Sequence, residues 1–146
     1  MAYTVYHLHS DDSLLDSCTK YSEYVDLAVA QGMKAIASTE HGKPSGWVSK
    51  KLYCQQKGIK FIHGVEIYLT ETLEEKIRDN YHTVLLAKNY DGVLELNKLI
   101  ELATRPDHTH YNPRITFDEF LAISPNIIKI SACIASPLRR LPHSHE

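Results

Sequence analysis

The chain has 146 residues, 43% hydrophobic and 23% charged, a balance typical of one compact globular domain. Lys and Arg number 16 and Asp and Glu 18, so a formal charge of -2 argues against nucleic-acid binding by bulk electrostatics. Six Gly, six Pro and ordinary apolar content exclude collagen-like, disordered and coiled-coil classes.

The first half of the chain alternates predicted strands and helices, without internal repeats or a linker. Ser22 can cap the first helix and Gly32 can end it, while Gly58 follows the second helix as a further stop signal. The elements that we predict are a strand at 4–7, a helix at 22–31, a strand at 35–38, a helix at 46–57 and a strand at 59–68.

The second half begins with a polar stretch at 71–80 that is expected to be irregular. The sequence Thr116-Phe117-Asp118-Glu119 is a capping box that opens a short helix. The other predicted elements are a strand at 83–87, a helix at 91–103, a loop at 105–114 and a strand at 127–130. This alternation predicts an α/β domain of parallel strands, whose carboxyl ends collect the functional groups.

No apolar run approaches the ~18 residues that a membrane span requires, and the first residues lack the regions of an export signal. The three cysteines, Cys18, Cys54 and Cys133, are odd in number and widely spaced, which argues against a disulfide framework. We therefore expect a reducing cytoplasmic location and no membrane contact. Nine histidines in so short a chain indicate metal or proton chemistry.

Several candidate ligands stand close to predicted strands. His7 and His9 are two residues apart, so on extended backbone both imidazoles face one side, as a metal requires. His41 directly follows a buried strand. Glu66 interrupts an apolar strand, where a carboxylate is tolerated when it binds a cation or forms a salt bridge, for example with Lys60.

Two further candidates also have structural interpretations, and the position of a third raises a question of strand direction. Asp16 could serve as a helix cap, and Cys133 could be a small buried hydrophobic residue. His82 precedes its strand, so it reaches the same rim only if 83–87 runs antiparallel or if 71–80 folds back. Together the candidate ligands are His7, His9, Asp16, His41, Glu66, His82 and Cys133.

The order of these motifs resembles the polymerase-and-histidinol-phosphatase (PHP) family over residues 4 to about 138. Within that family the chain is similar to the N-terminal domain of the bacterial replicative DNA polymerase III alpha subunit. The motifs that carry the resemblance are His7-Leu8-His9-Ser10, Ser13-Leu14-Leu15-Asp16, Thr39-Glu40-His41-Gly42, Gly64-Val65-Glu66-Ile67-Tyr68, Tyr81-His82 and Ser131-Ala132-Cys133. The resemblance implies a distorted seven-stranded β/α barrel with up to three divalent ions, usually zinc, manganese or iron.

The same resemblance implies a distribution of ligands among the ions. His7, His9 and Glu66 would hold the first ion and would be catalytic through metal-activated water. Glu66 would bridge to a second ion held with His82 and Cys133. The third ion would be held by the pair Asp16 and His41.

Two departures from the family pattern are visible. Glu40 stands where the family usually has Asp, which should affect the groups that orient the ligands more than the ligands themselves. The family's late Asp-x-His motif is expected beyond residue 146, so residues 1–146 would form an incomplete PHP domain. His143 and His145 repeat a His-x-His spacing, but a frayed tail is expected there.

The implied chemistry is phosphoester hydrolysis, with Lys43, Arg105 and Arg114 as candidate phosphate contacts or ordinary solvated charges. In the polymerase branch the substrate would be a DNA 3′ end, cleaved by a proofreading 3′–5′ exonuclease. The partners would be the rest of the polymerase III alpha subunit and the holoenzyme. A small-molecule phosphatase of the histidinol-phosphatase type and a metal-poor structural platform are alternatives. We expect the chain alone to be weak or inactive, and exposed strand edges to favour self-association.

Overall fold

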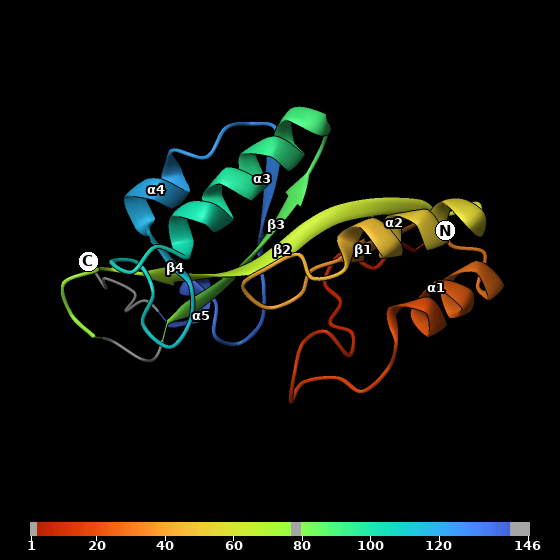
Figure 1. Ribbon diagram of the computed structural model, residues 1–146, viewed down its shortest axis with the longest axis horizontal. Coiled ribbons are helices and arrows are strands. Elements are labelled where there is room, and N and C mark those ends of the chain that lie inside the picture. The colour runs from red at the N-terminus through yellow and green to blue at the C-terminus, as the bar shows by residue number, and fades with distance from the viewer. Residues whose placement is uncertain (1–2, 77–79, 141–146) are drawn as a thin grey trace.

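The computed structural model describes residues 3–76 and 80–140 of the chain (Figure 1). The elements, in chain order, are α1 (Tyr21–Ala30), β1 (Ala35–Ser38), α2 (Trp47–Gln56), β2 (Lys60–Thr70), β3 (Tyr81–Ala87), α3 (Tyr90–Ala103), β4 (Arg114–Thr116), α4 (Phe117–Leu121), β5 (Ile127–Ser131) and α5 (Pro137–Arg140). No helix in this part of the chain is long and apolar enough to cross a membrane.

The strands form one mixed sheet in the order β1-β2-β3-β5, with β4 pairing β2 beyond the end of β1. β1 and β4 run parallel to β2, but β3 runs antiparallel to both of its neighbours. The expectation of an all-parallel sheet was therefore wrong. Residues 71–76 contain no helix, and an antiparallel return needs no crossover helix between the two strands.

One face of the sheet packs against α3 and α4, which lie on the same side of β2 and β3 in Figure 1. Val65, Ile67 and Leu69 alternate along β2 and point into this core, where they meet Leu96 of α3. The intervening residues of β2, including Glu66, therefore face the opposite side of the sheet.

The N-terminal part has a second core beneath α1 and α2, in which Val25, Ile36 and Cys54 are fully buried or nearly so. α1 begins after Lys20 and has no side-chain cap, so the predicted cap at Ser22 was wrong. Gly32 follows the helix with a φ of 71°, a left-handed conformation that glycine adopts without steric cost.

Other predictions need smaller corrections. The expected strand at 4–7 is reduced to one parallel bridge between Val5 and Ile36. Strand β4 lies at the end of the segment predicted as a loop. The capping box is confirmed, because Thr116 accepts from the Glu119 backbone and Glu119 from the Thr116 backbone. The three cysteines are free, as expected.

Candidate metal centre

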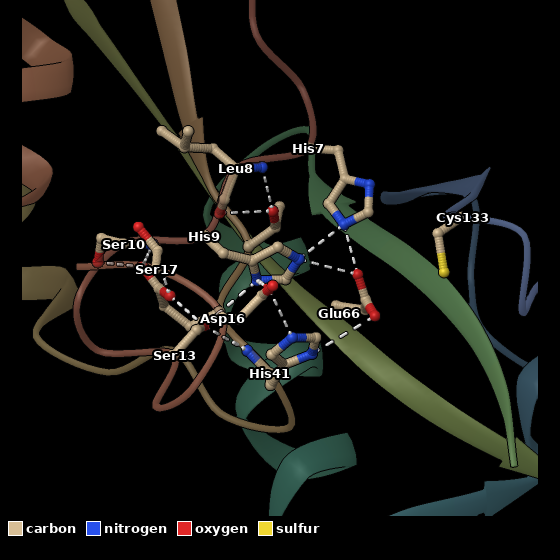
Figure 2. A network of polar contacts seen from close by, with 12 residues as sticks. His7, Leu8, His9, Ser10, Ser13, Asp16, Ser17, His41, Glu66 and Cys133 are labelled. Carbon is tan, nitrogen blue, oxygen red and sulfur yellow. Dashed lines mark hydrogen bonds and ion pairs between the residues drawn. The ribbon is translucent and has the colours of Figure 1, made fainter. Parts of the chain in front are cut away.

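His7 and His9 face one point from the segment that precedes α1 (Figure 2). Their Nε2 atoms are 2.8 Å apart, and both contact Oε2 of Glu66, at 3.1 Å for His9. Thr39 fixes the backbone between them, since its hydroxyl accepts from Leu8 N at 2.7 Å and donates to Leu8 O at 3.0 Å. The backbone between the two imidazoles is thus anchored to the residue that follows β1.

Glu66 stands at the centre of the cluster with only 1% of its surface exposed. Its second carboxylate oxygen, Oε1, lies 2.7 Å from Nδ1 of His82 and 3.4 Å from Nδ1 of His41. Burial raises the pKa of the Glu66 carboxyl, but its contacts with four imidazoles outweigh burial and bring the pKa far below its usual value. The alternative of a salt bridge to Lys60 does not occur among the described residues.

Asp16 and His41 form the outer part of the cluster. Oδ2 of Asp16 lies 3.0 Å from Nε2 of His41 and 4.0 Å from Nδ1 of His9. The rings of His9 and His41 stack with centroids 4.1 Å apart. Contact with Glu66 raises the pKa of His41, burial opposes this, and Asp16 adds to the rise. His9 is therefore shared between two groups of donors.

His82 and Cys133 close the cluster from the other side of Glu66. The sulfur of Cys133 is 3.6 Å from Nδ1 of His82. His82 lies near the start of β3, opposite Tyr68 in the antiparallel pairing with β2. The prediction that His82 reaches the cluster because its strand runs antiparallel to its neighbour is therefore confirmed.

The seven candidate ligands thus come together, although they are spread from residue 7 to residue 133. They form three groups, each with its ligand atoms within 4.8 Å of one another, namely His7, His9 and Glu66; His9, Asp16 and His41; and Glu66, His82 and Cys133. The first and last of these groups coincide with ligand sets that the resemblance implied, and the middle group adds His9 to the implied pair of Asp16 and His41. Their role as metal ligands stays a prediction.

The donors suit divalent cations. Nδ1 of His41 and Oε1 of Glu66 are buried and make no hydrogen bond of acceptable geometry, although they lie 3.4 Å from each other. Such atoms are costly unless something completes their coordination. Imidazole nitrogen, carboxylate oxygen and thiolate sulfur together match zinc and similar transition metals.

A buried network around Glu40 lies behind the cluster. The sequence predicted that Glu40 acts on the groups that orient the ligands, but not which partners form the network. Glu40 is 1% exposed and accepts hydrogen bonds from the backbone and hydroxyl of Ser10, at 3.1 and 2.6 Å, and from the hydroxyl of Ser13. Nζ of Lys50, from α2, lies 2.7 Å from Glu40. Ser13 in turn contacts Nδ1 of His9 at 3.2 Å, so Glu40 orients a candidate ligand through one hydroxyl.

The candidate phosphate contacts differ in how far they are buried. Arg114 is 1% exposed and donates from Nε to the carbonyl of His108 at 3.0 Å, so it supports the fold and does not reach the cluster as a free charge. Lys43, two residues after His41, and Arg105 are exposed. His143 and His145 lie outside the described residues.

The mixed sheet carries a cluster of His, Asp, Glu and Cys side chains on one face, which is the arrangement expected of a PHP-type fold, and the family comparison agrees. The sequence profile of the PHP domain family matches residues 6–144. The chain belongs to the PHP family.

Among curated proteins the chain is similar to bacterial DNA polymerases. It is 37% identical to DNA polymerase III subunit alpha of Borreliella burgdorferi over 92% of this chain and 12% of that protein. It is 34% identical to the error-prone DNA polymerase of Symbiobacterium thermophilum, over 98% of this chain and 12% of that protein. The chain therefore spans about an eighth of the length of these relatives.

Among solved structures, a candidate metal-dependent phosphoesterase from Bifidobacterium adolescentis matches with a TM-score of 0.51 and 16% identity. The match covers 68% of this chain and 32% of that one. At this identity the likeness concerns the fold alone. It supports the assignment of the mixed α/β sheet as part of a PHP-type barrel.

Proposed function

We propose that this chain is the PHP domain of a bacterial replicative polymerase and that it binds divalent metal ions in a phosphoesterase site. The single observation that carries the proposal is Glu66, a buried carboxylate in contact with four imidazoles. A carboxylate with both oxygens aimed at separate donor groups suits a ligand shared by two ions.

The candidate ligands can be assigned to three ions. His7, His9 and Glu66 would hold one ion, Glu66, His82 and Cys133 a second, and His9, Asp16 and His41 a third. When bound, such ions lower the pKa of water and stabilise charge on a phosphoryl group. Glu40 and Ser13 keep the imidazole of His9 in place. His7, His9 and Glu66 are the residues that we propose to be catalytic.

The proposed substrate is a DNA 3′ end, removed by 3′–5′ exonuclease activity. The support is the similarity to polymerase alpha subunits, together with exposed Lys43, two residues after His41, as a candidate phosphate contact. The remainder of the alpha subunit and the holoenzyme would be its partners, in the bacterial cytoplasm. Because the matched relatives are about eight times longer, we expect weak or no hydrolysis from these residues alone.

A structural platform is the second candidate. β5 ends the sheet order, with β3 as its one strand partner in the described part of the chain. An unpaired strand edge is a template for pairing with another chain. This edge could dock the rest of a polymerase, or a second copy of the chain.

The deciding experiment is elemental analysis of the purified chain after dialysis against zinc, manganese or iron. We expect stoichiometric metal that is lost in His9→Ala and in Glu66→Gln. The matched control is His110→Ala, which removes a histidine outside the cluster. Circular dichroism of each variant separates loss of metal from loss of fold.

Activity then distinguishes the substrates. Release of nucleotides from 3′-labelled single-stranded DNA, abolished by Glu66→Gln, supports the exonuclease. Preferential cleavage of p-nitrophenyl phosphate supports the small-molecule phosphatase instead. A folded chain that binds no metal refutes the metal centre and leaves the platform.

A further inference from the structure

A separate pocket lies along the first residues of β2, the last residues of β3 and the start of α3. Its volume is about 420 Å³, which falls in the range of small-molecule sites, roughly 300–1,000 Å³. In the β2–β3 pairing the pocket adjoins the Gly64–Leu86 pair, whereas the metal cluster lies at the Glu66–Val84 and Tyr68–His82 pairs. None of the seven candidate metal ligands lines it.

The charge of this pocket is unusual for a chain of net charge -2. Lys51, Lys60 and Lys88 line it, and no Asp or Glu does. Within the described residues no ion pair involves any of the three lysines, whereas Lys50 and Lys57 both have carboxylate partners. Three exposed ammonium groups around one cavity favour an anionic ligand.

His63 provides an independent indication that the pocket binds a ligand. It lines the pocket with 6% of its surface exposed, and neither ring nitrogen has a hydrogen-bond partner. Burial and nearby Lys51 lower the pKa of His63 to about 4, so at neutral pH its ring has one N–H donor and one acceptor. Buried polar atoms of this kind are normally satisfied, by protein, water or ligand.

The aromatic side chains that line the pocket indicate a second part of the ligand. Tyr6, Trp47, Phe61 and Tyr90 line the same cavity, and Trp47 meets the ring of His63 edge-on with centroids 5.1 Å apart. Tyr6 and Tyr90 are 51% and 73% exposed, so their rings are open to stacking. Aromatic rings beside clustered lysines are the combination that holds a base and its phosphate.

We propose that this pocket binds a phosphorylated aromatic ligand of the nucleoside monophosphate type. The phosphate contacts Lys51, Lys60 and Lys88, the N–H of His63 donates to an anionic oxygen, and the base stacks on the aromatic wall. The same chemistry is offered by a free mononucleotide and by a nucleotide within a DNA strand. The site does not depend on the proposed metal centre.

The test is isothermal titration calorimetry of the full chain with thymidine monophosphate, thymidine, inorganic phosphate and a five-nucleotide DNA strand, all with EDTA. We expect saturable binding of thymidine monophosphate, at least about ten-fold tighter than thymidine or phosphate alone, because each lacks one half of the contacts. Binding of the strand tighter than of the mononucleotide identifies nucleic acid as the source, and the reverse identifies the free nucleotide.

The variants locate the site. Lys51→Gln and His63→Phe should each weaken binding of thymidine monophosphate about ten-fold, whereas Lys98→Gln, an exposed lysine of α3 outside the pocket, should leave it unchanged. Lys51 is exposed, so its variant is expected to fold even if His63→Phe does not. Absence of binding, or equal binding by Lys51→Gln and Lys98→Gln, overturns the proposal.

Binding that survives in Glu66→Gln shows that the pocket is independent of the metal centre, and its loss in that folded variant refutes that independence.

Discussion

Removing the ammonium group of Lys50 tests how much the buried network behind the cluster contributes to stability. Lys50 is 6% exposed, and its Nζ lies 2.7 Å from Glu40 and 2.8 Å from Asp12. In Lys50→Met the Glu40 charge would stay buried with hydrogen bonds from Ser10 and Ser13 alone. Breaking a buried ion pair on one side costs about 3–5 kcal/mol, and the remaining hydrogen bonds place the expected loss at the lower end, about 3 kcal/mol.

Lys57→Met is the matched control for this prediction. The Lys57–Asp26 pair has the same 2.7 Å separation, but its partners are 36% and 50% exposed. Water screens such a pair, so its removal should barely change the stability. The comparison therefore varies burial at constant distance.

The assay is urea unfolding followed by circular dichroism. With a slope of about 2 kcal/mol per M, the loss in Lys50→Met lowers the midpoint by about 1.5 M, without a change in slope. The double variant Lys50→Met with Glu40→Gln should regain part of the loss, because the uncompensated charge is gone. Equal midpoints for Lys50→Met and Lys57→Met would refute the reasoning that burial makes the Glu40–Lys50 pair important.

Three further predictions concern stability elsewhere. Folding lowers the pKa of His63 from 6.5 to about 4, so between these pH values the unfolded chain binds one more proton than the folded chain. The contribution of His63 to the free energy of unfolding therefore rises by about 3 kcal/mol from pH 4 to pH 6.5. His63→Phe should remove this rise, which urea titrations at several pH values would measure. Gly64→Ala would place a Cβ 2.8 Å from the carbonyl oxygen of Leu85, so thermal unfolding should show a loss of about 1–3 kcal/mol, and an unchanged melting temperature would contradict this steric argument. Thr116→Ala removes one half of the capping box of α4 and should cost about 0.5–2 kcal/mol, whereas Thr116→Ser should cost much less.

Local patterns in the sequence predicted most of the elements. β1 is found where it was predicted, α3 begins one residue early, and the capping box at Thr116 forms as expected. These features depend on neighbours within a few residues, where periodicity and hydrogen bonds to nearby backbone decide the conformation. The same reasoning failed for Ser22, because several positions near a helix start can serve as its first residue.

The sequence by itself therefore determined which donor side chains the protein has, most of the helices and strands around them, and the motif order of its family. Only the tertiary structure decided that β3 returns antiparallel and brings His82 to Glu66, and that Glu40 is paired with Lys50. Strand direction depends on closing a loop and burying two faces at once, and neither cost is visible in a short window of sequence. The separation of Glu66 and Cys133 along the chain shows why their meeting is a property of the whole sheet.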